Sequence, residues 1–345
     1  MHNRSSWRYG GFLGLMAVCL VLIGAGHGQA RQVVDGCGRT VELPGTITRV
    51  VTAGGTPSLN AFLCALGKGD TIVNGLPQGL HGRQWQFQTV FAPQVATAPV
   101  VASMGPDWAP DLEALQALPH DLVLVASRET ADRLAARGFR AYCLTWRDPD
   151  SVFTTLDLLG DVMDATPRAA ALKTAFTANL DRVAKATADI PPDKRVKAIY
   201  IRAGTMMIPM VSTARFLIEK AGGRYAAPAD LSLEHPRIGY EQLLAWDPDV
   251  LLVFNPREVE QVLADSRLAG LSAVRRKAVY AVPFGMHGFT HFTPEQALAV
   301  LWMGKTLYPE RFADLDMVAE TRAFYSRFCG KELSDAQVRQ ILRLD

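Results

Sequence analysis

The segment EALQALPHDLVLV, residues 113–125, returns later in the chain as EQLLAWDPDVLLV, residues 241–253. The first glutamate, a leucine, an alanine, an aspartate and the final apolar run coincide at one constant offset, without a gap. Each copy fits a short helix followed by an apolar strand, the kind of strand that is buried on both faces of a parallel sheet. Because the period is too long for a solenoid, the pattern predicts two similar α/β lobes in one chain.

Alternating strands and helices surround both copies of this segment. In the first half we expect a hairpin over 33–41, strands over 49–52, 121–126 and 140–144, and helices over 56–66 and 131–137. In the second half we expect strands over 196–201, 249–254 and 279–282, and helices over 213–220 and 296–307.

Helix ends are marked by capping residues. Thr56 is predicted to cap the first helix, with Pro57 at the first helical position and Gly67 beyond its end. Thr293 is predicted to form a capping box with Gln296, three residues later. Ser334 is predicted to form the same capping box with Gln337 at the start of a terminal helix.

A longer helix is predicted between the two halves, starting at Thr166-Pro167 and ending near residue 188. Its apolar residues recur every three or four positions and give one buried stripe, formed by Leu172, Phe176, Leu180, Val183 and Ala186. A helix of about 22 residues is about 33 Å long, which is enough to run along two lobes.

The N-terminus has the composition of a cleavable signal peptide. Arg4 and Arg8 precede an apolar run over 12–23, and the small residues Gly28 and Ala30 then supply a peptidase site. We expect the mature chain to begin at residue 31, which indicates export to the periplasm. The alternative is an uncleaved membrane anchor, but a spanning helix needs about 20 apolar residues.

Composition and charge exclude several classes of protein. The 345 residues are 49% hydrophobic and 20% charged, as in globular proteins, and the length allows two domains. The mature chain would be formally neutral, whereas nucleic-acid binders normally carry a basic surplus. No esterase elbow, zinc-protease motif or paired catalytic carboxylates are present, so we predict that the chain is not an enzyme.

Four cysteines would remain after cleavage: Cys37, Cys64, Cys143 and Cys329. They are scattered, with no C-x-x-C pair, so a zinc site has little support. Because an exported protein lies in an oxidising compartment, a disulfide between two of these cysteines is possible. Because Cys64 falls in a helical pattern and Cys143 in a strand pattern, we expect these two to be buried free thiols.

Several of these features resemble one known family. They are the D-x-x-G-R-x-V-x-L-P opening at 35–44, the strand at 49, Leu66-Gly67, the strand at 121–125, the helix after Pro167, Ala221-Gly222-Gly223, the segment from Glu241, and the stretches 279–283 and 301–310. In this order and spacing they resemble the periplasmic binding proteins of the ferric-siderophore, haem and cobalamin ABC importers. The resemblance covers nearly all of the mature chain.

The resemblance implies two Rossmann-like α/β lobes joined by a single long rigid helix, with a ligand cleft between the lobes. The corresponding bounds are a signal peptide over 1–30, an N-terminal lobe over 31–150, a helical linker over 151–192 and a C-terminal lobe over 193–345. It also implies a metal chelate as transported ligand, with no intrinsic cofactor, and a monomeric protein that meets a membrane permease and its ATPase subunit.

One acid on each lobe is implied to dock onto basic residues of the permease. The matching positions are Glu113 and Glu241, which are also the first residues of the two repeat copies. The alternative is that each glutamate is only a helix-start charge that the helix dipole favours.

The ligand is expected beyond the carboxyl ends of the strands, where open α/β sheets bind their ligands. The candidate ligand-binding residues are Thr56, Trp85, Met104, Trp108, Met206, Met207, Met286, His287, Phe289 and His291. Aromatic rings offer stacking surface to a chelate, and histidine and methionine can ligate a metal, for which His287 and His291 are the candidates. Arg83 and Arg202 can pair with an anionic chelate.

Two alternatives stay open at this point. The same fold could bind a bare metal ion through His81, Asp107, His287 and His291, or an oxyanion such as molybdate or tungstate at Gly54–Thr56, at a helix N-terminus. A secreted metal-dependent enzyme that uses the same histidines is the third hypothesis.

Overall fold

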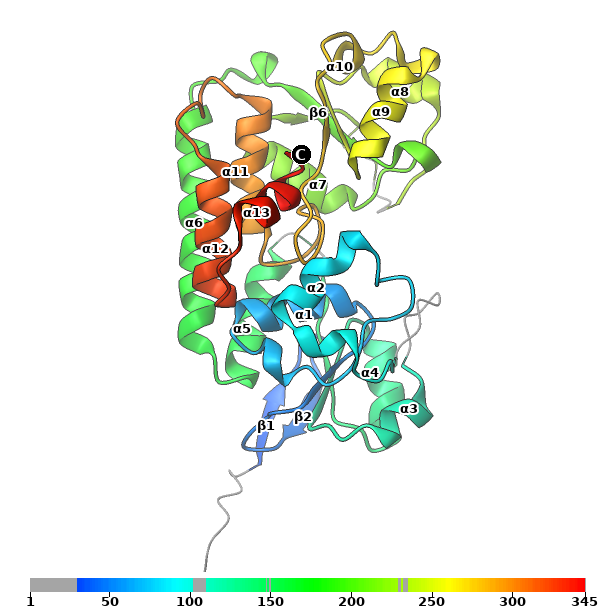
Figure 1. Ribbon diagram of the computed structural model, residues 1–345, viewed down its shortest axis with the longest axis vertical. Helices are drawn as coiled ribbons and strands as arrows, with labels where there is room; N and C mark the ends of the chain where they lie inside the picture. Colours follow the sequence, from blue (N-terminus) through cyan, green and yellow to red (C-terminus); the bar gives the residue numbers. More distant parts are fainter. Residues whose placement is uncertain are drawn as a thin grey trace, which may run out of the picture.

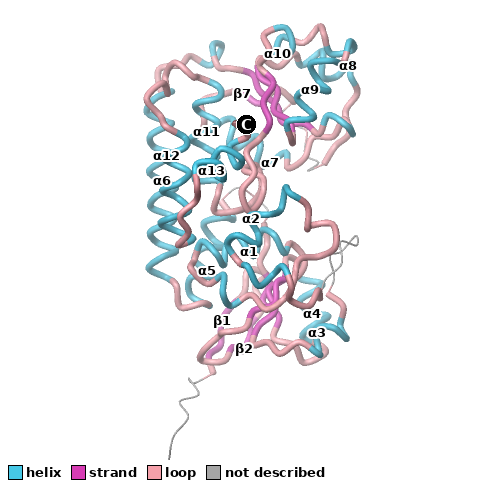
Figure 2. The backbone as a smooth tube through the Cα atoms, in the orientation of Figure 1, coloured by secondary structure: helices cyan, strands magenta, loops and turns pink. Residues whose placement is uncertain are grey.

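Two parallel sheets, one in each half of the chain, form the centres of two lobes (Figure 1). The computed structural model describes residues 30–101, 110–146, 148, 150–228, 231 and 235–344. The first sheet has the order β3 (Val50–Thr52), β4 (Leu122–Val125), β5 (Ala141–Cys143). The second has the order β7 (Arg224–Tyr225), β6 (Lys197–Ile201), β8 (Val250–Val253), β9 (Val279–Ala281). Figure 2 shows the strands gathered into these two lobes, with helices around them.

The first lobe also contains a hairpin, four helices and three 3-10 turns among the described residues. They are the hairpin strands β1 (Arg31–Val34) and β2 (Thr40–Leu43), the helices α1 (Thr56–Ala65), α2 (Gln86–Phe91), α3 (Leu112–Ala117) and α4 (Arg128–Ala135), and the 3-10 turns η1 (Gly69–Thr71), η2 (Arg83–Trp85) and η3 (Pro93–Ala96).

Helix α5 lies in the first lobe, α6 runs along both lobes, and the second half of the chain contains the remaining elements (Figure 1). Their bounds are Ser151–Val162 for α5 and Thr166–Thr187 for α6. The later elements are η4 (Pro192–Lys194), η5 (Ala203–Thr205), α7 (Val211–Lys220), α8 (Tyr240–Trp246), α9 (Pro256–Ala264), η6 (Ser266–Leu268), α10 (Ser272–Arg275), α11 (Gln296–Leu307), α12 (Met317–Cys329) and α13 (Asp335–Leu342).

The predicted repeat is confirmed as a repeat of structure. Helix α3 leads into β4 and helix α8 leads into β8, and the residues of the two units correspond at the offset seen in the sequence. The shared aspartates make the same contact. Asp121 accepts from the backbone N–H of Arg49 at 2.9 Å, and Asp249 accepts from that of Lys197 at 3.0 Å. Each carboxylate therefore joins the start of its own strand to the start of the neighbouring one.

The predicted long helix is α6, and it lies along both lobes. Three of the five predicted stripe residues, Leu172, Phe176 and Val183, are buried, whereas Leu180 and Ala186 are half-buried; Ala169 and Thr187 are the other buried residues of α6. Figure 1 shows α11 and α12 beside it on the same side of the molecule. The C-terminal helices thus also contact the first lobe, and the exact domain boundaries stay a prediction.

Two predicted N-caps are wrong, whereas the predicted N-cap Ser334 and the predicted Gly67 beyond the end of α1, with φ 70°, are confirmed. Gly55, in the left-handed region with φ 114°, holds the N-cap position of α1, because Thr56 already lies inside the helix and donates its hydroxyl to the Thr52 carbonyl at 3.0 Å. Glu295, not Thr293, precedes α11. The capping box of Ser334 is present at the start of α13.

The prediction of a free thiol at Cys143 is also wrong. Cys143 forms a disulfide with Cys37, with Cα atoms 5.7 Å apart. The turn between β1 and β2 lies against the end of β5, where the N–H of Gly36 donates to the Cys143 carbonyl at 2.8 Å, and this contact brings the two cysteines together. Cys64 is a buried free thiol, as predicted, and Cys329 is free.

The predicted signal peptide falls almost entirely on residues 1–29, outside the described part of the chain. Among the helices of the described part, none is long and apolar enough to cross a membrane.

Removal of the disulfide should lower stability without changing the fold. Cys37 and Cys143 have a sequence separation of 106, and a bridge that closes so long a loop restricts the unfolded chain strongly. We expect the double variant Cys37→Ser/Cys143→Ser to lose about 2–5 kcal/mol of unfolding free energy in denaturant titrations. Reductant should lower the wild-type midpoint to that of the variant and leave the variant unchanged. Equal midpoints for oxidised and reduced wild type would contradict the assignment.

Candidate functional site

The two lobes meet at the loop that follows β9. Trp85, at the end of η2 in the first lobe, lies edge-on to two rings of this loop, Phe284 at 5.0 Å and His287 at 5.2 Å between ring centroids. The Gln88 side chain of α2 donates to the Met286 carbonyl at 2.8 Å. Trp85 is half-buried at this boundary, so one predicted ligand-binding residue does lie where the lobes face each other.

A buried carboxylate holds the loop in place. Glu295 is 2% exposed and accepts from the backbone N–H groups of Met286 at 2.8 Å and His287 at 3.1 Å. It also accepts a hydrogen bond from the hydroxyl of Tyr325 on α12. Burial raises the pKa of this carboxyl to about 7 against an ordinary 4.5, although these donors favour the charged form.

The hydrogen bond of Gln88 to the loop continues into the first lobe. Gln88 accepts from the Asn60 side chain at 2.9 Å, and Asn60 accepts from the hydroxyl of Thr52, at the end of β3, at 2.8 Å. All three side chains are fully buried. The sequence prediction missed Gln88 and Asn60. Asn60 stands within an otherwise apolar helix, and a buried amide needs hydrogen-bond partners. This pattern could have predicted a buried polar contact at α1.

The histidine pair lies on this loop with both rings uncharged at neutral pH. The ring centroids of His287 and His291 are 3.8 Å apart. Burial lowers the pKa of His287 well below its usual range, helped by His291, and burial lowers the pKa of His291 to about 4, helped by His235 and Arg202. Both rings are therefore neutral hydrogen-bonding groups.

His287 is arranged as a hydrogen-bond donor. Its Nδ1 accepts from the N–H of Gly288 at 2.8 Å, so the neutral ring carries its proton on Nε2. A metal-ligating histidine normally binds through one nitrogen and donates with the other. Because Nδ1 already accepts, His287 is poorly set to ligate a metal through Nε2 and well set to donate to a ligand oxygen.

A basic cavity of about 470 Å³ is lined by residues of both lobes. Its lining residues are Arg83, Gln84, Asn255, Pro256, Arg257, Gln340 and Arg343. Among these described lining residues there is no aspartate or glutamate, and three are arginines. Burial and the neighbouring Arg83 lower the pKa of Arg343, whose Nε is buried without a hydrogen-bond partner. The cavity therefore has an excess of positive charge that an anion would relieve.

Arg202, also predicted to face an anion, is already engaged. Its guanidinium lies 3.7 Å from the ring centroid of Phe254 and its Nε lies 3.4 Å from the carboxylate of Glu258. That carboxylate also accepts from the N–H groups of Ala203 and Phe254, each at 3.1 Å. Arg202 thus mainly contacts residues at the ends of β6 and β8. The sequence prediction did not include Arg257 and Arg343, which line the basic cavity.

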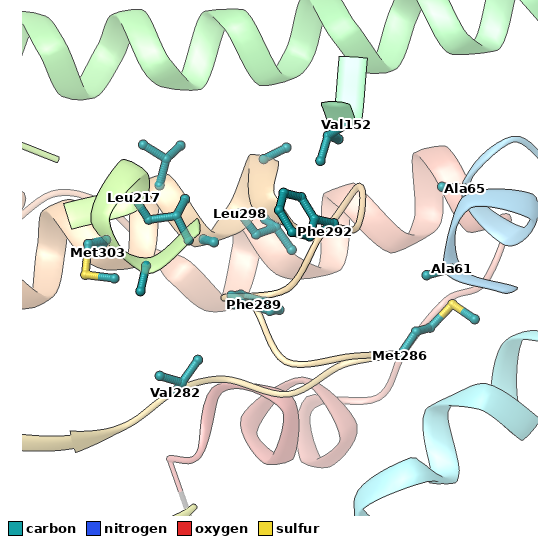
Figure 3. Packing of buried hydrophobic residues seen from close by; sticks show 14 of the residues in the cluster. Ala61, Ala65, Val152, Leu217, Val282, Met286, Phe289, Phe292, Leu298 and Met303 are labelled. Carbon is teal, nitrogen blue, oxygen red and sulfur yellow. The ribbon is translucent and has the colours of Figure 1, made fainter. Parts of the chain in front are cut away.

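Three predicted ligand-binding side chains are packed in the interior. Met286 is 1% exposed, and Phe289 and Thr56 are fully buried. Figure 3 shows Met286 directed toward α1, which carries Ala61, and Phe289 among the apolar residues of the second lobe. Since these side chains face the core, we leave them out of the proposed binding surface.

The two adjacent methionines that follow η5, Met206 and Met207, occupy a different place. Met206 lines a separate cavity of about 270 Å³ together with Tyr240 and Asp265. Met207 pairs with Arg202 through backbone hydrogen bonds of 2.7 and 3.3 Å. Met104, Asp107 and Trp108 lie outside the described residues.

The described residues do not assemble a metal site from the predicted ligands. His81 is exposed and its Nε2 lies 3.0 Å from the Leu76 carbonyl. In the described part of the chain, no group of three or more histidine, cysteine, aspartate or glutamate side chains is arranged to hold a metal ion.

Glu113 and Glu241 lie in the first turns of α3 and α8, and both are exposed. Figure 1 shows α3 and α8 on the side of the molecule opposite α6, one on each lobe. Within the described ranges, neither carboxylate has an ion-pair partner, unlike Asp121 or Asp249 nearby in sequence. Both charges are therefore available to another molecule.

Comparison with known proteins agrees with this architecture. The family model described as "Periplasmic binding protein" matches residues 88–285, more than half of the chain. The chain belongs to the periplasmic binding protein family. Members of this family carry a transported ligand, and membership implies a periplasmic location and a role with an ABC transporter.

Individual relatives extend the likeness. The chain is 28% identical over 182 residues to the molybdate-binding protein MolA of Haemophilus influenzae, a match that spans 52% of each chain and so only about half the length of that relative. A periplasmic solute binding protein of Veillonella parvula has a similar structure, with a TM-score of 0.79, 20% identity and coverage of 92% of this chain and 98% of that one. The structure of MolA bound to molybdate matches with a TM-score of 0.77 at 23% identity. The match covers 88% of this chain and 99% of the MolA chain.

The buried Glu295 should make stability depend on pH. Because its folded pKa of about 7 lies above the ordinary 4.5, its contribution to stability is present below about pH 4.5 and is lost as pH rises through 7. In Glu295→Gln this loss should be absent, so the unfolding free energy of the variant relative to wild type should rise between pH 5 and 8 by about 2 kcal/mol.

Chemical denaturation of both proteins at several pH values measures this difference. The histidines with lowered pKa destabilise both proteins alike at low pH, so their effect cancels. The exposed Glu310→Gln is the matched control and should follow wild type. A constant difference between Glu295→Gln and wild type would show that Glu295 stays charged in the folded protein.

Proposed function

We propose that this protein captures an anion in the cleft between its lobes and delivers it to the permease of an ABC importer. The observation that carries the proposal is the basic cavity shared by both lobes, where Arg83, Arg257 and Arg343 meet without an acidic lining residue among those described. Arginines from both sides of a cleft favour a ligand that neutralises them when the lobes are together.

A tetrahedral oxyanion such as molybdate or tungstate is the first candidate cargo. The 28% identical relative is named a molybdate-binding protein, which supports this class. The neutral His287 stacks on Phe284, whose ring centroid lies 5.7 Å from the Arg343 guanidinium, and it carries an Nε2–H group of the kind that binds oxyanions. The same tautomer argues against a bare metal cation.

An anionic metal chelate is the second candidate. The cavity volume of about 470 Å³ lies in the range typical of small-molecule sites and is generous for a bare oxyanion. The half-buried Trp85 follows the lining residue Gln84 in the chain and adds an aromatic ring, and the Arg343 guanidinium lies 5.7 Å from the ring centroid of the buried Phe284. Rings and cations together suit a ferric siderophore or a haem-like anion.

The remaining parts of the proposal follow from the sequence. Export by a cleavable signal peptide that ends at Ala30, division into lobes over 31–150 and 193–345 around a linker, and a monomeric state belong to it. We also propose that Glu113 and Glu241 dock onto basic residues of the permease, because both are exposed and lack ion-pair partners among the described residues.

Ligand binding tests the cargo. Purified mature protein is titrated in a calorimeter with molybdate, tungstate, sulfate, phosphate, a ferric catecholate, haem and Ni²⁺. We expect at least one anion to bind, and Arg83→Gln/Arg343→Gln to weaken its affinity at least tenfold, since each charge-assisted hydrogen bond contributes about 1.5–3 kcal/mol. Arg224→Gln, an exposed arginine on β7, is the control. Binding of Ni²⁺ and of no anion would refute the proposal.

Permease docking is tested separately. The double variant Glu113→Gln/Glu241→Gln should keep the ligand affinity of wild type, because neither glutamate lines the basic cavity. Stimulation of the permease-linked ATPase in proteoliposomes should fall at least tenfold. Replacement of Asp157 and Asp161, two exposed acids of α5, is the control. Full stimulation by the glutamate variant would exclude these residues as docking groups.

A further inference from the structure

The loop after β9 carries one partly accessible side chain at the boundary of the lobes. Residues 282–286 and 288–290 are buried, whereas His287 is half-buried. Its ring lies 5.2 Å from the ring of Trp85 in the first lobe, measured between centroids. Because Nδ1 accepts from the N–H of Gly288, the proton of the neutral ring is on Nε2. What His287 offers to a ligand in the cleft therefore depends on the direction of this Nε2–H.

One peptide group of this loop is held by both halves of the chain. The carbonyl of Met286 and the N–H of His287 belong to the same planar unit. Gln88, on α2 of the first lobe, donates to the carbonyl at 2.8 Å, and Glu295, next to α11, accepts from the N–H at 3.1 Å. Rotation of the peptide group would break both bonds. The backbone that carries the imidazole therefore has one orientation as long as both partners are in place.

The neighbours of Gln88 fix the orientation of its amide. Its Nε2 lies 3.0 Å from the Pro57 carbonyl as well as 2.8 Å from that of Met286, and carbonyl oxygens only accept. The NH₂ group must therefore face both carbonyls, which leaves Oε1 to accept from the Asn60 amide at 2.9 Å. Asn60 in turn accepts from the Thr52 hydroxyl at 2.8 Å. Each member of this buried chain thus has one allowed orientation.

The position of Gln88 requires a neutral amide. The side chain is completely buried, donates to two carbonyls and accepts from another amide. A lysine or an arginine there could donate but not accept, and it would add a buried charge. An ionised glutamate could accept but would face two carbonyl oxygens. The contact between the lobes is therefore neutral, and the positive charge of the cleft is left to the arginines of the basic cavity.

We propose that Gln88 is a positioning residue for ligand binding, which holds the Met286–His287 peptide from the first lobe and so keeps the imidazole in the orientation that donates to the ligand. This inference rests on the proposed capture of an anion in the cleft. Because Gln88 is fully buried, it acts through His287 and not by contact with the ligand. A donor that is already oriented loses little conformational freedom on binding, which raises affinity.

Removal of the amide tests this role. Gln88→Met keeps the length of the side chain and removes its donors and its acceptor. Gln94→Met is the matched control, because Gln94 is also an amide of the first lobe that donates to two carbonyls, those of Gly69 at 2.7 Å and Ile72 at 3.2 Å, but both belong to its own lobe. Denaturant midpoints show how much stability each variant loses. Gln88→Asn keeps an amide on a shorter side chain and is the second variant if Gln88→Met does not fold.

The first measurement needs no ligand. NMR spectra of the histidine ring nitrogens report which nitrogen carries the proton, and His287→Gln assigns the signal. We expect wild type and Gln94→Met to carry the His287 proton on Nε2. Gln88→Met and Gln88→Asn should show a mixture of both tautomers, because the loosened loop no longer keeps the Gly288 N–H on Nδ1. The wild-type tautomer in both Gln88 variants would overturn the inference.

The second measurement is calorimetric titration with molybdate. We expect Gln88→Met to weaken binding about fivefold, in the range of one lost neutral hydrogen bond, and Gln94→Met to leave it within about twofold of wild type. Equal weakening by both variants would show that a general loss of stability is the cause, which also overturns the inference. If wild type binds no molybdate, that cargo is excluded, and the NMR comparison still decides whether Gln88 holds His287.

Discussion

The buried carboxylate of Glu295 is the contact on which the arrangement of the two lobes depends. It binds two successive backbone N–H groups, at Met286 and His287, and so determines the path of the loop that carries both histidines. The carbonyl of Met286 then accepts from Gln88 of the first lobe. One charge-bearing group thus connects α11 and α12 to the cleft. Isolated carboxylates are rarely buried, and this one is retained because several donors surround it.

Around this anchor, the cleft combines groups with one chemical preference. The arginines of the cavity supply positive charge from both lobes, and the neutral His287 carries an N–H donor on the loop that meets the first lobe. A bare cation would meet repulsion there, and a ligand with anionic oxygens would meet donors on several sides. In the proposed function, the family scaffold captures the ligand, and these few side chains select an anion.

Much of the fold was predictable because it depends on local patterns. The strands and the helix α6 follow from apolar runs and from one stripe of spacing three to four. The repeat followed from identical residues at one offset. The predictions of N-caps at Thr56 and Thr293 were wrong because Gly55 and Glu295 hold the N-cap positions in the folded chain. Cys143 was assigned a free thiol because nothing in the sequence places the turn of the hairpin beside β5.

The sequence by itself determined the two α/β units, the long helix and the paired glutamates, since each depends on residues close together in the chain. The tertiary structure alone decided which side chains share a space. Met286 and Phe289 follow the same strand as His287, yet they pack inward while the histidine lies at the cleft. Arg83, Arg257 and Arg343 come from three distant segments and meet in one cavity. Contacts between remote segments depend on the packing of all the elements between them, and no local pattern records that packing.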